Sequence, residues 1–178
     1  MRILGGCALA ALVAAVSLGP AQASQAQSVN AGGAGIAVQA HEYCVVVVEK
    51  LQPGAVQSKV ANKVCSPNAN DAQLQQILAS STSLIRFWEK ENYQGYYTTV
   101  TGKSGPCDLA GYGFRDLRGV NEAVGGITSY QYYNGCNAQQ YWDGINYGGA
   151  TRENVSNNPN IGDPWNDSLN SMKVWNLS

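Results

Sequence analysis

The chain has few charged residues and only one histidine. Of its 178 residues, 13% are charged, and 11 Lys and Arg are balanced by 12 Asp and Glu. A nucleic-acid-binding surface needs a basic patch, so this composition argues against a nucleic-acid partner. The single histidine excludes sites that need two imidazoles, and the chain has no P-loop or dinucleotide-binding glycine pattern. We therefore predict no catalytic residues and a protein that is not an enzyme.

The chain also lacks an apolar run long enough to span a bilayer. The longest run, Ile3–Leu18, follows the positive Arg2 and precedes the small-x-small sequence Ala21-Gln22-Ala23. This order is typical of a secretory signal peptide that is cleaved after Ala23. We expect residues 1–23 to be that signal peptide, and the mature protein to be secreted and extracellular, with no membrane anchor.

Loss of the signal peptide would remove one of the five cysteines. The four that remain are Cys44, Cys65, Cys107 and Cys136. An even number in an exported chain predicts two disulfides, for which three pairings are possible. We favour the pairing of sequence neighbours, Cys44–Cys65 and Cys107–Cys136, in which each bond stabilises the fold by about 3 kcal/mol. The CxxC spacing of a zinc site is absent.

Composition divides the mature chain into parts. Residues 24–40 are rich in Gln, Ser, Ala and Gly, as in a flexible linker. Residues 41–83 contain a β-branched run that predicts a strand, a Pro-Gly turn, a second strand and a short helix over 72–78. We expect this disulfide-tied appendage to dock on the larger unit. All aromatic residues except Tyr43 lie in that unit, residues 84–178.

The larger unit contains an internal repeat. The octets Trp88–Gly95 and Trp142–Gly149 share an aromatic residue, an acidic residue, a tyrosine and a final glycine. We predict that each octet is a sharply folded hairpin, in which the glycine adopts positive φ and the tyrosine ring covers the fold. Each half then reaches a late serine, Ser129 or Ser171. Its hydroxyl can bond the hairpin backbone and close a four-stranded Greek key.

The residues of this repeat, Trp88, Tyr93, Gly95 and Ser129 with Trp142, Tyr147, Gly149 and Ser171, resemble the βγ-crystallin family. The resemblance covers about residues 85–178. It implies an all-β, βγ-crystallin-like sandwich of two Greek-key motifs, residues 84–133 and 134–178. A small disulfide-tied N-terminal hairpin plus a short helix precedes this sandwich. We expect Trp88, Tyr93, Trp142, Tyr147 and Trp165 to centre the core, and an insertion between Cys107 and Gly126 to form a pinned loop.

The resemblance also implies a calcium site. The stretch Asn166–Ser171 resembles the family's calcium-binding loop, although Asn170 stands where Ser or Thr is usual. The acidic residue of the opposite repeat joins such a site. The predicted calcium ligands are Glu89, Asn166, Asp167 and Asn170. In the first half, Val124 and Gly125 replace the Asn and Asp of the motif, so a second site with Asp143 and Thr128 is degenerate. Alternatively, Asn166 and Asp167 only cap a turn.

Three classes of function remain open. The first is a secreted, non-enzymatic module that is structural or associated with a cell surface and stabilised by calcium. The second is a secreted peptidase inhibitor that presents the pinned loop to an extracellular peptidase. The third is a toxin-like or carbohydrate-binding protein that contacts a glycan of the cell wall. Burial of Tyr112, Phe114 and Tyr130 would argue against the third class. The sequence does not indicate an oligomeric state.

Overall fold

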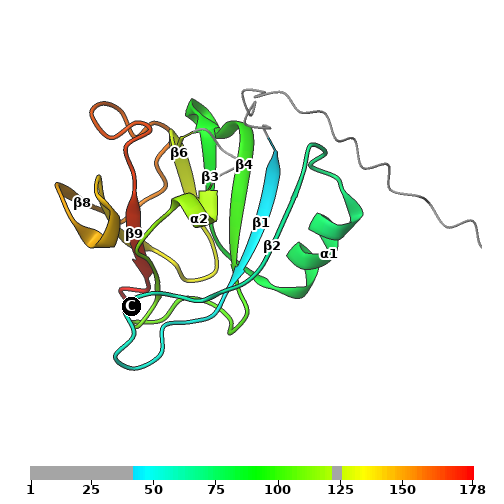
Figure 1. Ribbon diagram of the computed structural model, residues 1–178, viewed down its shortest axis with the longest axis horizontal. Helices are drawn as coiled ribbons and strands as arrows, with labels where there is room; N and C mark the ends of the chain where they lie inside the picture. Colours follow the sequence, from blue (N-terminus) through cyan, green and yellow to red (C-terminus); the bar gives the residue numbers. More distant parts are fainter. Residues whose placement is uncertain (1–41, 122–125) are drawn as a thin grey trace, which may run out of the picture. The chain divides into compact units, whose positions relative to one another are not determined.

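The described residues form nine strands in two sheets, with two short α-helices (Figure 1). The computed structural model describes residues 42–121 and 126–178, so the expected signal peptide and linker lie outside the described residues, as do Val124 and Gly125. The strands are β1 (Tyr43–Val48), β2 (Val60–Ser66), β3 (Thr82–Lys90), β4 (Gln94–Gly102), β5 (Tyr112–Phe114), β6 (Ser129–Tyr132), β7 (Ala138–Trp142), β8 (Thr151–Asn154) and β9 (Ser171–Trp175). The helices are α1 (Ala72–Ser80) and α2 (Arg118–Asn121), and the 3-10 turns are η1 (Glu91–Tyr93) and η2 (Ile145–Tyr147).

The first sheet has the strand order β2-β1-β4-β3-β6. Consecutive valines suit β1 to a position in which both faces of the strand are covered, and Val45 and Val46 are both buried. β1 pairs antiparallel with β2, and Cys44 lies opposite Cys65 and forms a disulfide with it. On its other side β1 runs parallel to β4. The N-terminal hairpin therefore extends the same sheet as β3 and β4.

The second sheet has the order β5-β9-β7-β8, and it includes a strand from the first half of the repeat. β5 pairs antiparallel with β9, so the first half supplies an edge strand to the second sheet. In return, Asn158 of the second half exchanges two backbone hydrogen bonds of 3.0 Å with Tyr130 of β6. Each half thus lends a segment to the sheet of the other, and the two Greek keys interlock.

The connection between β1 and β2 joins the two sheets. Residues 49–59 leave the first sheet and reach the free edge of β5, where Ser58 N donates to Gly113 O at 2.7 Å. Gly113 N in turn donates to Ser58 Oγ at 3.1 Å, and Tyr147 Oη donates to Val56 O. We call residues 49–59 the strap. It covers a backbone edge that would otherwise be exposed, because edge strands carry unpaired N–H and C=O groups.

The centre of the core differs from the expected set of aromatics. Its largest fully buried aromatic residues are Phe87, Tyr112, Phe114, Tyr130 and Tyr141. Of the expected set, Trp88 is buried at 6% exposure and Trp165 packs partly buried against the core. Trp142, Tyr93 and Tyr147 are only half-buried. For Trp142 the reason is the alternation of side chains along β7, in which Tyr141 points inward and Trp142 points outward.

The insertion between Cys107 and Gly126 is not one protruding loop. Tyr112 and Phe114 lie at its middle and are buried in β5, and α2 follows. Within the described part of the chain, residues 103–111 form a loop before β5, and Cys107 in that loop is bonded to Cys136. Both favoured disulfide pairings are therefore confirmed.

Helix α1 follows β2 in the chain and lies beyond the β2 side of the first sheet in Figure 1. It begins after Asp71, whose carboxylate accepts hydrogen bonds from Gln73 N at 2.8 Å and Leu74 N at 3.4 Å, as an N-cap does. Leu74 is its buried residue. Across residues 42–121 and 126–178, no helix has the length and apolar character needed to span a membrane.

Candidate functional site

The two octets fold into hairpins with matching backbone geometry. Asn92 and Tyr93 have φ of 56° and 62° in the first hairpin, and Asn146 and Tyr147 have φ of 59° and 60° in the second. The tyrosine rings lie against the tryptophans of the same octets, with centroids 5.2 Å apart in the first and 4.9 Å in the second. The closing glycines at positions 95 and 149 have φ of 80° and 82°, which explains why glycine ends each octet.

The two late serines hold these hairpins closed. Ser129 Oγ accepts a hydrogen bond from Tyr93 N at 3.2 Å and donates to Lys90 O at 2.6 Å. Ser171 Oγ accepts from Tyr147 N at 3.0 Å and donates to Gly144 O at 2.6 Å. Both serines are fully buried. The role predicted for each serine from the sequence is the role it has in the structure.

The acidic residue of each octet folds back over its own hairpin. A Cβ added to Gly95 would lie 2.6 Å from Glu89 Oε1, and one added to Gly149 would lie 2.0 Å from Asp143 Oδ1. The Glu89 side chain is only 11% exposed. Glycine is therefore required at both positions for two reasons: the backbone has positive φ, and the carboxylate occupies the space of a Cβ.

Three oxygens from different segments meet beside the first hairpin. Thr128 Oγ1 lies 2.8 Å from Glu89 O and 2.7 Å from Asn166 Oδ1. A hydroxyl carries one proton, so it can donate to only one of these two acceptors at a time. Asn166 comes from the loop before β9, whereas Glu89 and Thr128 belong to the first Greek key. We call these three residues the Thr128 cluster.

Asn170 belongs to a different group of atoms. Its side-chain Nδ2 donates to Asp143 O and, at 3.3 Å, to Ser168 O. The structure therefore regroups the predicted residues: Thr128 joins Glu89 and Asn166, and Asn170 joins Asp143. The sequence predicted Thr128 in the degenerate site, with Asp143 of the opposite hairpin, whereas the structure places it beside Glu89 of its own repeat.

Asp167 lies against the loop of the first half. Its φ is 59°, and its Oδ1 would lie 1.7 Å from a Cβ added to Gly126. Its backbone N–H donates to Ile127 O at 3.4 Å. The glycine at position 126 therefore leaves the room that the exposed Asp167 carboxylate occupies.

These observations decide the fold. Two interlocked Greek keys, each with a folded aromatic hairpin closed by a serine, are what the resemblance implied. The chain has a βγ-crystallin-like fold.

Comparisons with known proteins give structural neighbours and no family match. No protein-family model matches the chain, and no curated protein matches it. Among solved structures, a double mutant of a βγ-crystallin domain from Clostridium beijerinckii is 22% identical with a TM-score of 0.41, over 53% of this chain and 98% of that one. A βγ-crystallin domain from Flavobacterium johnsoniae is 22% identical with a TM-score of 0.39, over 53% and 97%. The N-terminal domain of protein S is 20% identical with a TM-score of 0.39, over 53% and 98%.

Proposed function

We propose that the protein is an exported, non-enzymatic βγ-crystallin-like module that binds calcium weakly at the Thr128 cluster. One observation carries this proposal: Thr128 Oγ1 lies within 2.8 Å of two further oxygens but has one proton to share between them. A cation would satisfy all three oxygens at once.

The chemistry of the cluster suits calcium. Calcium is coordinated by about six to eight oxygens, which can come from amide side chains, backbone carbonyls and water. The cluster supplies one hydroxyl, one carbonyl and one amide oxygen, and the exposed Asp167 carboxylate follows Asn166 directly. Because so few protein ligands and one carboxylate contribute, we expect a dissociation constant of roughly 10⁻⁴–10⁻³ M, as in other extracellular modules.

Thermal unfolding tests the calcium proposal. Calcium that binds only the native state raises stability by about 2.7 kcal/mol at 100 times its dissociation constant, so Tm should rise in millimolar calcium. Thr128→Val keeps the branched shape and removes the hydroxyl, and it should abolish the rise. Asn170→Ala is the matched control and should leave the rise intact. Identical melting of the wild type in calcium and in chelator would overturn the proposal and leave Asn166 as a hydrogen-bond partner of Thr128.

A second candidate is the peptidase inhibitor, supported by Leu109. This side chain is 76% exposed on the loop that the Cys107–Cys136 disulfide pins. Asp108 Oδ1 accepts hydrogen bonds from Ala110 N at 3.1 Å and Gly111 N at 3.0 Å. The Gly111 N–H and the nearby Lys50 ammonium lower the pKa of Asp108, so the hydrogen-bonded carboxylate persists to lower pH than that of a free aspartate. Inhibition of a secreted peptidase by the wild type, lost in Leu109→Asp, would support this candidate.

The carbohydrate-binding alternative loses the platform first considered for it. Tyr112, Phe114 and Tyr130 are all buried, at 1% exposure or less, so none of them can stack on a sugar.

A further inference from the structure

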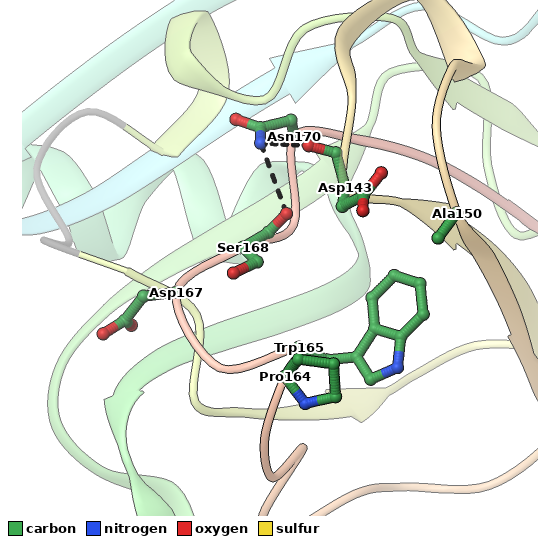
Figure 2. Close-up of a pocket in the computed structure, with 7 residues that line it drawn as sticks. All are labelled: Asp143, Ala150, Pro164, Trp165, Asp167, Ser168 and Asn170. Atoms are coloured by element: carbon green, nitrogen blue, oxygen red, sulfur yellow. Dashed lines mark hydrogen bonds between the residues drawn. The ribbon is translucent and has the colours of Figure 1, made fainter.

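A cleft opens at one end of the second sheet, between the hairpin that joins β7 to β8 and the loop before β9 (Figure 2). Its volume is about 310 Å³. The hairpin contributes Asp143 and Ala150, and the loop contributes Trp165, Asp167 and Asn170. Ligand pockets typically measure roughly 300–1,000 Å³, so this cleft suits a single small ring and not a large ligand.

One wall of the cleft is a fixed aromatic ring. Trp165 makes an edge contact with the buried Tyr141, with centroids 5.2 Å apart and planes at 80°. This contact holds the indole in place, and Figure 2 shows it beside Ala150 with the Asp143 carboxylate above it. An indole face held in this way is a ready surface for the C–H face of a ring or for a cation.

The polar atoms around the indole are acceptors. Both hydrogen bonds that Asn170 Nδ2 donates go to backbone carbonyls, which leaves its amide oxygen to accept from a ligand. The Asp143 carboxylate is exposed and has no hydrogen bond or ion pair with the described part of the chain, whereas the Asp167 carboxylate points away from the indole, toward Gly126 (Figure 2). Acceptors and one negative charge favour a ligand that carries hydroxyls and a positive charge.

The cleft is open because the two repeats carry side chains of different size at one position. The residue after the closing glycine is Ala150 in the second octet and Tyr96 in the first. Tyr96 packs against Tyr43, with ring centroids 4.9 Å apart. The small side chain of Ala150 therefore leaves room at a position where the other repeat carries a large ring.

We propose that this cleft binds one amino-sugar unit of a partly deacetylated glycan. The C–H face of the sugar stacks on Trp165, its ammonium group donates to the Asp143 carboxylate, and a hydroxyl donates to the Asn170 amide oxygen. An amino sugar satisfies each feature with one ring: a flat apolar face, several O–H donors and a single charge. A bare metal ion would use the oxygens and leave the indole wall without a partner. The proposal does not depend on calcium at the Thr128 cluster.

Titration with three tetrasaccharides tests the proposal on the mature protein, in chelator, with tryptophan fluorescence as the readout. The three are a glucosamine tetramer, its N-acetylated form and a glucose tetramer. We expect the glucosamine tetramer to bind more tightly than the other two by at least about tenfold, the loss expected when a charge-assisted hydrogen bond is removed. Binding should weaken as salt is raised, because exposed charges are screened.

Three variants locate the binding. Ala150→Tyr places in the cleft the residue that the first repeat carries, and it should abolish binding while the melting temperature stays near that of the wild type. Asp143→Asn should weaken binding about tenfold. Glu153→Gln removes an exposed charge from the same hairpin outside the cleft, and binding should not change.

Several outcomes would overturn the proposal. Equal binding of the charged and neutral tetramers would show that the Asp143 carboxylate has no role in binding. Binding that survives in Ala150→Tyr would place the ligand elsewhere. If a tetralysine peptide displaces the glucosamine tetramer and binds more tightly, the cleft recognises a basic side chain of a protein. Failure of the calcium proposal would be seen separately, as the absence of a calcium-dependent rise in Tm.

Discussion

The two repeats have the same hairpin but different surroundings. In the first, β4 is covered by β1, and Tyr93 and Tyr97 pack on Trp88, which is 6% exposed. In the second, β8 is the edge of its sheet, and Trp142 remains half-buried with Tyr147 against it. The serine-closed hairpin therefore fixes the local fold, and the neighbouring strands decide how much of it is buried.

The loops of the two repeats also differ, and the difference crosses between them. Asn166 of the second repeat completes the oxygen cluster at the first hairpin. The first repeat has Val124 at the matching sequence position, which offers no side-chain oxygen to the second hairpin. Asn170 there bonds to the carbonyl of Asp143 instead. The Asn166 contact therefore crosses from one repeat to the other, whereas Thr128 and Asn170 each bond to the hairpin of their own repeat.

The largest expected difference between the repeats is in the two tryptophans. Trp88→Ala should lower the free energy of unfolding by about 3–5 kcal/mol, as for a large buried aromatic. Trp142→Ala should cost roughly half as much, because the side chain is already half-exposed. Urea unfolding of both variants measures this difference. Equal losses would show that burial by β1 and the neighbouring tyrosines does not distinguish the repeats.

Removal of either closing serine should cost the same stability, in contrast to the two tryptophans. Ser129→Ala and Ser171→Ala each leave one backbone N–H and one carbonyl without their partner, and each should cost about 1–3 kcal/mol. The hydrogen bond from the tyrosine N–H to the serine is 3.2 Å in the first hairpin and 3.0 Å in the second, and the bond from the serine to the carbonyl is 2.6 Å in both. We therefore expect similar losses of stability. Thermal unfolding measures both. A loss confined to one variant would contradict the symmetry of the hairpins.

Local features of the fold could be predicted from the sequence, and long-range pairings could not. The octets are encoded by residue types at a fixed short spacing, and the serines and cysteines pair with residues of the same segment of the chain. The parallel pairing of β1 with β4 and the course of the strap depend on which edges are left open, which no spacing records. β5 contains only three residues, Tyr112–Phe114, and gives too short an alternation to be recognised as a strand.

The residues of the candidate site could likewise be predicted singly from local motifs, but their grouping in space could not. The sequence named Glu89 and Asn166, because each occupies a recognisable motif position, and the structure brings both to Thr128. It grouped Asn170 with them because motif residues adjacent in the chain were taken to serve one ion. The cleft at Trp165 had no sequence signal other than Ala150, whose meaning emerges only when Tyr96 of the first repeat is placed beside it.

The smallest expected effect concerns alkaline pH and the buried tyrosines. Burial raises the pKa of Tyr130 to about 12, with the nearby Tyr141 adding to the shift, and burial with the charge of Asp108 raises the pKa of Tyr112 to about 12. An unfolded tyrosine ionises near pH 10, so the folded state holds its proton longer. The stabilisation is therefore complete below about pH 10 and is lost as pH rises from about 10 to 12.

Urea unfolding from pH 8 to pH 11 should show this decline, and Tyr130→Phe should reduce its slope. Tyr147→Phe should reduce the slope by a similar amount, because burial also raises the pKa of Tyr147 to about 12. Identical slopes in the wild type and Tyr130→Phe would show that Tyr130 does not contribute to the alkaline loss.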